Sequence, residues 1–182
     1  MNKLVFFIIC FWVIGIIIKL FFGFDSNQMI FSEILIKPNF SSWLGRDDYG
    51  RDIFYRLIDG FLNSFEIIFL VTIISGFVGV LIGVISGYFG GKLDLFVRYI
   101  TTLFMAFPGI LLAIAFAAIL SPGKINLIFA LSIGGWVGYA RLARAQTVLI
   151  KNLDFVKASE SMGSSRKKII TNHILPSLKT PL

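Results

Sequence analysis

Residues 67–89 read IIFLVTIISGFVGVLIGVISGYF and contain no charged side chain. A helix needs about 20 apolar residues to cross the hydrocarbon core of a bilayer, which is about 30 Å thick. We therefore expect a membrane-spanning helix here. Gly79, Gly83 and Gly87 recur every fourth residue within it, so they share one helix face on which the backbone of another helix can approach closely. This stripe predicts a helix-packing surface.

The composition of the whole chain is that of a membrane protein. Of its 182 residues, 57% are hydrophobic and only 15% are charged, and phenylalanine alone supplies 20. Soluble domains average about half apolar and about a quarter charged residues, and disordered chains are poor in aromatic residues. The composition thus excludes a soluble globule and a disordered chain.

Three further segments are candidates for membrane spans. Leu4–Phe24 is interrupted only by Lys19, near one end, where the side chain can reach the interface. No small-residue cleavage site follows this segment, which indicates an uncleaved anchor rather than a signal peptide. Tyr99–Gly123 carries no charge, and Ile125–Ala140 is short and is expected to extend into the residues that follow. The chain is predicted to be all-α, a polytopic membrane helix bundle with four transmembrane helices.

Lysine and arginine are unevenly distributed between the connecting segments. With the N-terminus in the cytoplasm, eleven of them face inward and five outward, whereas Lys19 stays in the membrane. Cytoplasmic segments carry the excess of basic residues, so we expect a cytoplasmic N-terminus. Residues 25–64 then form the large outer segment, 90–98 a short inner turn and 141–182 an inner basic region. This topology explains the net charge of +7, and no nucleic acid partner is predicted.

The third apolar segment contains Phe107-Pro108-Gly109. Proline removes a backbone hydrogen bond and kinks a helix. A broken membrane helix can line a substrate path, but we interpret Pro108 as a residue that sets the shape and packing of its helix.

Catalytic and cofactor chemistry is not indicated by the sequence. No predicted span has a charged residue near its middle, as a proton relay would need, and no nucleophile-elbow or zinc-protease motif is present. The run Gly87–Lys92 resembles a phosphate-binding loop, but Ser86 stands at the first glycine and Leu93 at the position that binds magnesium. His173 and Cys10 are single residues of their kinds, too few for a metal site. We predict no enzyme, no bound cofactor and no metal.

The inner basic region has the pattern of two helices joined by a glycine turn. Apolar residues recur at helical spacing before and after Gly163, and Pro176 lies inside the second run. These apolar residues are Leu149, Leu153 and Val156, then Ile170, Ile174 and Leu178. A hairpin over 150–178 is predicted. Two interpretations stand, an amphipathic hairpin on anionic lipid or a helix that docks into a groove of a cytosolic partner.

Five runs of the sequence together resemble one protein family. The outer run 44–60, expected as an amphipathic entry helix, alternates its charges in sign. The other four are Gly87-Tyr88-Phe89-Gly90-Gly91 with Asp94, Ala106-Phe107-Pro108, Gly135-Trp136 with Gly138-Tyr139-Ala140-Arg141-Leu142, and His173-Ile174-Leu175-Pro176. Their order and spacing are similar to those of the permease subunits of bacterial dipeptide, oligopeptide and nickel ABC importers, most of all the second, C-type permease.

The resemblance implies that the inner hairpin is the coupling element of such an importer. The family signature is Glu-Ala-Ala, a glycine and a later Leu-Pro, and here Lys157-Ala158-Ser159, Gly163 and Leu175-Pro176 stand at those positions. By this resemblance the hairpin enters a groove on a cytosolic ATPase, and Lys157 reverses the charge of the usual glutamate.

The resemblance also implies the partners and the location of the protein. The partners are a second permease subunit, two cytosolic ATPases that bind the ATP, and an extracytoplasmic substrate-binding protein. The location is the bacterial inner membrane, with its lipid bilayer around the helices, and the cargo is peptide or nickel.

Three domains are expected, an N-terminal transmembrane anchor over 1–24, an extracytoplasmic segment over 25–64 and a permease core over 65–182. Family members carry two further spans after the coupling hairpin, so we expect a fragment of a longer chain or the product of a truncated gene. The alternative function is that of a truncated, transport-incompetent membrane protein that retains only partner binding.

Overall fold

The computed structural model describes residues 12–17, 19, 21 and 23–178. In this part of the chain the regular elements are helices, beside one isolated bridge between Arg46 and Asp52, so the predicted all-α class is confirmed. The chain divides into two compact units, Met1–Glu66 and Ile67–Leu182, and each is described by itself. The expected domain limits at residues 24 and 64 stay predictions.

The outer run 44–60 does not form the single entry helix that we expected. Gly45 and Gly50 take φ values of +76° and +72°, a left-handed backbone that L side chains rarely adopt, and they keep residues 44–52 in a loop. The long helix α2 begins only at Ile53 and continues without a break to Phe89.

The start of α2 is fixed by a carboxylate. The Asp52 side chain accepts hydrogen bonds from the backbone N–H of Phe54 at 2.9 Å and from the Ser42 hydroxyl at 2.7 Å. Asp52 is therefore the N-cap of α2, and it ties the outer loop to the helix. The same loop contains the short 3-10 helix η1 (Phe31–Glu33).

Asp47 organises the middle of the outer loop. Its carboxylate accepts hydrogen bonds from the backbone N–H of Tyr49 and of Arg51, each at 2.9 Å, and pairs with the side chains of Arg51 and Arg56. Burial alone would raise the pKa of Asp47, but these hydrogen bonds outweigh it and hold the pKa well below its usual range.

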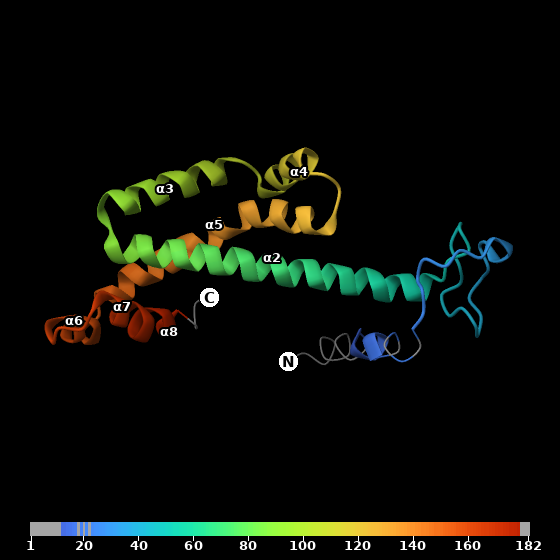
Figure 1. Cartoon of the computed structure of the whole chain (residues 1–182), viewed down its shortest axis with the longest axis horizontal. Coiled ribbons are helices and arrows are strands. Elements are labelled where there is room, and N and C mark those ends of the chain that lie inside the picture. Colours follow the sequence, from blue (N-terminus) through green and yellow to red (C-terminus); the bar gives the residue numbers. More distant parts are fainter. Residues whose placement is uncertain (1–11, 18, 20, 22, 179–182) are drawn as a thin grey trace. The chain divides into compact units, whose positions relative to one another are not determined.

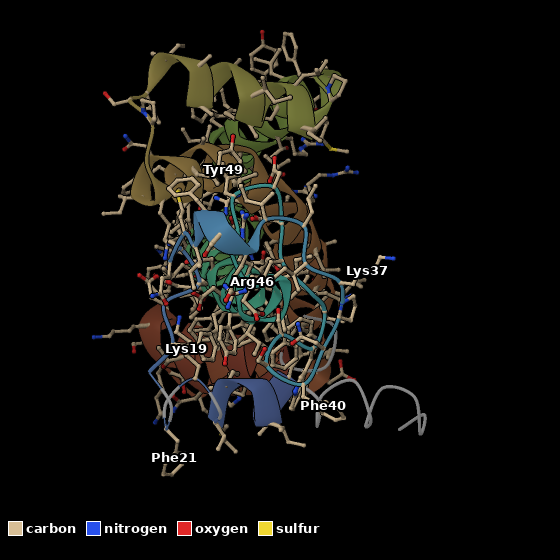
Figure 2. The ribbon with its side chains drawn as sticks, turned by 90° about the vertical axis from the view of Figure 1, so that its right-hand side faces the viewer. Lys19, Phe21, Lys37, Phe40, Arg46 and Tyr49 are labelled. Carbon is tan, nitrogen blue, oxygen red and sulfur yellow. The ribbon has the colours of Figure 1, made fainter. Side chains whose placement is uncertain are left out.

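The described part of the first apolar segment is helical at residues 12–17, 19 and 21. Trp12 stacks on Phe61 of α2 with ring centroids 4.0 Å apart. Lys19, labelled in Figure 2, was expected to reach the membrane interface, and it forms an ion pair with Asp59 of α2. Gly23 and Phe24, at the end of the predicted anchor, are described and are not helical, and its other residues lie outside the described part of the chain.

The second unit contains most of α2 and the helices that follow it. After α2 come α3 (Gly91–Ala106), α4 (Gly109–Ile119) and α5 (Lys124–Lys151), and α4 folds back onto α5 (Figure 1). Among the described residues, α2 and α5 are long and apolar enough to cross a membrane, and α3 with α4 adds a third candidate if the bent pair is one span.

Two sequence expectations in this unit need correction. The predicted inner turn over 90–98 is limited to Gly90 and Gly91, which take φ values of +66° and +60°, and α3 starts at Gly91. The expected kink at Pro108 is a complete break, because Phe107 is extended, as residues before proline prefer. The axes of α3 and α4 differ by 86°.

The glycine stripe of α2 lies directly against the backbone of α5. A Cβ atom at Gly79 would be 3.0 Å from the Ala140 nitrogen, and one at Gly83 would be 2.9 Å from the Arg144 nitrogen. A Cβ at Gly87 would be 2.8 Å from the Arg144 carbonyl oxygen. Both helices thus contribute a contact every four residues, at a distance that only glycine allows.

We expect Gly83→Val to destabilise the second unit, because its side chain would overlap the backbone of α5. Overpacking of this kind costs about 1–3 kcal/mol and should lower the midpoint of thermal unfolding in detergent. Gly60→Val is the matched control on α2, since a Cβ there meets no heavy atom within 4 Å. Equal destabilisation by both substitutions would contradict the close approach.

The low pKa of Asp47 predicts the acid sensitivity of the outer loop. A carboxylate with a depressed pKa stabilises the fold above its unfolded-state pKa of about 3.9, and this contribution is lost as the pH falls through the folded-state value. The Tyr49 and Arg51 amides should therefore be protected from hydrogen exchange near neutral pH, relative to unstructured amides at the same pH. This protection should be lost in strong acid. Asp47→Asn should remove it already at neutral pH, whereas Asp48→Asn, at an exposed neighbour, should not.

Candidate functional site

The candidate site is the hairpin that follows α5. It consists of α6 (Asp154–Ser161), a turn at Gly163 with φ of +82°, and a second helical stretch. That stretch comprises α7 (Arg166–Ile169), the π-helix η2 (Ile170–Ile174) and α8 (Leu175–Ser177). The wide π-turn comes just before Pro176, which has no N–H to continue the regular ladder.

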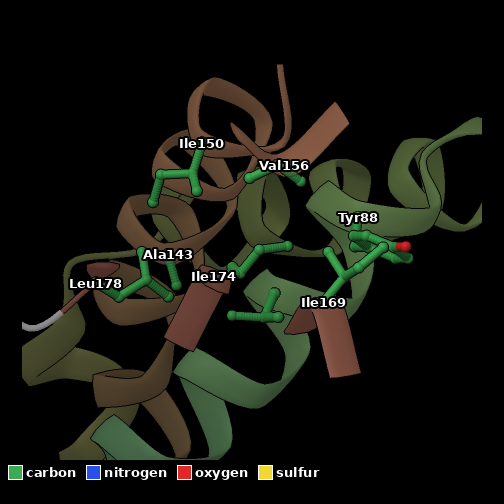
Figure 3. Packing of buried hydrophobic residues seen from close by; sticks show 8 residues of the cluster. Tyr88, Ala143, Ile150, Val156, Ile169, Ile174 and Leu178 are labelled. Atoms are coloured by element: carbon green, nitrogen blue, oxygen red, sulfur yellow. The ribbon is translucent and has the colours of Figure 1, made fainter. Parts of the chain in front are cut away.

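A shared apolar cluster attaches this hairpin to the ends of α2 and α5 (Figure 3). Each side chain of the cluster is at most 7% exposed. The cluster contains Val84 and Tyr88 of α2, Ala143 and Ile150 of α5, and Val156, Ile169, Ile174 and Leu178 of the hairpin. Because the three parts bury the same surface, the hairpin cannot shift without repacking α2 and α5.

Ser159 joins the two arms of the hairpin. Its hydroxyl oxygen lies 3.0 Å from that of Ser164 and 3.2 Å from Nε2 of His173. The His173 ring also contacts the ring of Phe155 edge to face, with centroids 5.8 Å apart. His173 is thus a structural residue of the hairpin.

The two faces of α6 differ in their surroundings. Val156 and Ser159 are buried against the rest of the hairpin. Phe155 is 50% exposed, Met162, just after the helix, is 80% exposed, and Ala158 between them also faces outward. An exposed apolar stripe on a helix of 8 residues is the surface that helix-in-groove recognition uses.

The structure separates the residues that we expected to form the coupling site. Lys157 and Ala158 are exposed on α6, whereas Ser159 points into the hairpin. Gly163 forms the turn, and Leu175 and Pro176 lie at the far end of the second stretch, in α8. Gly79, Gly83 and Gly87 lie at the crossing with α5, and Pro108 lies at the break between α3 and α4.

Polar contacts that sequence reasoning missed join α2, α3 and α5 toward the end of α5, which the hairpin follows. Arg144 of α5 makes a two-pronged ion pair with Asp94 of α3, with one bond of 2.7 Å, and Ser86 of α2 donates to the same carboxylate at 2.8 Å. Lys151 donates to the Tyr88 carbonyl at 2.7 Å. The available signal was the pair of opposite charges that follow two of the apolar segments, Asp94 after the second and Arg144 after the fourth.

The fold and the hairpin define a multi-pass helical membrane protein with a basic hairpin on one side. Residues 79–182, more than half of the chain, match the family model described as the inner membrane component of binding-protein-dependent transport systems. The chain belongs to this family.

The relatives are permeases named for peptide transport. The chain is 34% identical over 158 residues to the probable D,D-dipeptide transport system permease protein of Escherichia coli (strain K12). The aligned residues make up 87% of the chain and 53% of that protein. The chain is 42% identical over 138 residues to the oligopeptide transport system permease protein of Lactococcus lactis subsp. lactis (strain IL1403), covering 75% and 47%. It is 34% identical over 151 residues to the glutathione transport system permease protein of Pectobacterium atrosepticum, covering 83% and 50%. The chain thus spans about half the length of these relatives.

We expect Ser159→Ala to loosen the hairpin without unfolding the chain. A neutral buried hydrogen bond contributes about 1 kcal/mol, so its loss should raise the open population of the hairpin about fivefold. Trypsin should then cleave faster after Arg166, Lys167 and Lys168, which lie beyond the Gly163 turn. Ser161→Ala, at an exposed position of the same helix, is the control, and equal cleavage of the two variants would argue against the Ser159 link.

Proposed function

We propose that this chain is the transmembrane permease subunit of an ATP-driven peptide importer, and that α6 is its contact with a cytosolic ATPase. One observation carries the proposal. The hairpin buries Val156 and Ser159 of α6 and leaves exposed an apolar stripe made of Phe155, Ala158 and Met162, the last of which lies just after the helix. An apolar stripe held in this way fits into a groove of a partner protein.

The location of the partner follows from charge. The inner basic region includes Arg166, Lys167 and Lys168 of the hairpin, and the excess of basic residues marks the cytoplasmic side. In this orientation the N-terminus is cytoplasmic and α6 faces the cytosol. Lys157 is exposed on α6, so the receiving groove has to accept a positive charge at that position.

The remaining partners are proposed from the family. They are a second permease subunit, two ATPase subunits and an extracytoplasmic substrate-binding protein. The ATPases bind the nucleotide, and this chain serves as a translocation subunit without enzymatic activity or a cofactor of its own. Peptide is the proposed cargo because the relatives are named for dipeptide, oligopeptide and glutathione transport, and no observation here favours nickel.

The proposal predicts that charge on the exposed stripe of α6 disrupts ATPase docking. Phe155→Asp and Met162→Asp should each reduce co-purification with a tagged ATPase subunit of the same transport system about tenfold, as the loss of an interface anchor does. Phe31→Asp places the same charge at an exposed phenylalanine of the outer loop and should leave co-purification unchanged.

Uptake of a labelled dipeptide into vesicles that contain all subunits is the second readout. It should require ATP and fall with the two α6 variants. Docking without uptake would instead support the partner-binding alternative. No docking by the unaltered chain would contradict the proposed function.

A further inference from the structure

A cationic groove lies between α3 and α5 in the second unit, and the proposed coupling function does not use it. Its volume is about 840 Å³. Its polar lining consists of Arg98, Thr101 and Thr102 of α3 and Arg141 and Arg144 of α5.

Within the described part of the chain one carboxylate lies beside this groove, and its acceptor positions are already occupied. Asp94 accepts hydrogen bonds from Ser86 at 2.8 Å and from two nitrogens of Arg144, and it pairs with Arg98 at 3.3 Å. Two carboxylate oxygens offer about four acceptor sites, so these contacts saturate Asp94. Three guanidinium groups and one carboxylate leave the groove with a net charge of about +2.

Arg141 has the weakest partner of the three arginines. Its guanidinium lies against the Met105 sulfur, and a thioether is a poor acceptor that carries no charge. Among the described residues no carboxylate pairs with Arg141, so its charge faces the groove. It lies on α5 before the helix ends at Lys151, on the side where the basic hairpin follows.

The groove is bordered by an apolar one. A second groove, of about 450 Å³, shares Met105 and Arg141 with the first. Its other walls are Phe104, Phe107, Pro108, Gly109 and Leu112 of the α3–α4 segment and Gly134, Val137 and Gly138 of α5. A cationic groove beside an apolar groove at the proline break suits a ligand that carries both a negative charge and an apolar chain.

We propose that the two adjoining grooves bind an anionic phospholipid of the cytoplasmic leaflet. The phosphate lies on Arg141 and Arg98, and part of an acyl chain lies in the apolar groove at Pro108. Basic pockets between membrane helices on the cytoplasmic side are suited to anionic headgroups. A peptide suits the site less well, because its terminal amine would need a carboxylate and Asp94 is saturated.

The test places the full chain in bilayers of equal parts phosphatidylglycerol and phosphatidylcholine. The chain is then released from the bilayer, and native mass spectrometry counts the lipids that stay bound to it. The unaltered chain should retain phosphatidylglycerol in preference to phosphatidylcholine. Arg141→Gln should lower this retention about fivefold, the usual effect of one basic residue near anionic lipid. Lys167→Gln removes the same charge from the exposed surface of the hairpin and should not lower it.

Gly138→Leu tests the apolar groove without changing any charge. A Cβ at Gly138 meets no heavy atom within 4 Å, so the fold should tolerate leucine while the side chain fills the groove. Retention of phosphatidylglycerol should fall, whereas Gly60→Leu, with equally open surroundings on α2, should have no effect.

Three outcomes would overturn the proposal. Equal retention of both lipids by the unaltered chain would show that the groove does not select an anion. Displacement by glycerol phosphate with no effect of Gly138→Leu would show that the ligand is free phosphate. Displacement by dialanine would assign the groove to peptide.

Discussion

The close approach of α2 and α5 is the constraint on which the second unit depends. The contacts recur every four residues along both helices, from Gly79 against Ala140 to Gly87 against Arg144. A repeat of this kind is degenerate, because a slide of one helical turn would again place glycine against a small residue or backbone. The glycines alone therefore set the distance between the helices, and something else has to set their register.

Polar contacts at one end supply that register. Arg144 reaches Asp94, and Lys151 reaches the Tyr88 carbonyl. A slide of α5 by one turn, about 5.4 Å, would break both contacts and leave the partly buried Asp94 with only Ser86 and Arg98 as partners. The hairpin packs on α2 and α5 through the shared apolar cluster, so the arrangement of these two helices decides where α6 lies. A displacement of α6 would therefore require α2 and α5 to repack, because all three parts share one packed cluster.

The membrane helices could be predicted from sequence because the hydrocarbon core of a bilayer requires apolar side chains along the whole length of a span. Hydropathy alone identified α2 and α5, and the glycine repeat identified the face on which they meet. Their bounds were less predictable. The start of α3 at Gly91 depends on two positive φ values that hydropathy does not record, and proline predicts a break but not the direction of the next helix.

The hairpin shows where periodicity fails. Leu149 and Leu153 continue the spacing of Val156, yet they are 64% and 47% exposed while Val156 is buried. The helix ends at Lys151 and restarts at Asp154, so residues on either side of this break no longer share a face. Ser159 illustrates the complementary limit, because its partner His173 is fourteen residues away and no local spacing indicates the contact. Neighbouring residues of one family signature can thus differ in role. Ser159 packs inside the hairpin, whereas Lys157 and Ala158 lie on its surface.

The basic residues after residue 140 show the same division of roles. For topology they count alike, because the positive-inside bias depends on number and location. In the structure, Arg144 is neutralised by Asp94, the hairpin lysines are exposed, and Arg141 faces a groove with only a thioether beside it. A charge count therefore predicts which side of the membrane a segment occupies but cannot predict which charge is available for a ligand. Whether a charge is available depends on the acceptors that the fold brings within reach of it. Here Arg141 is available because the carboxylate of Asp94 is already saturated by other partners.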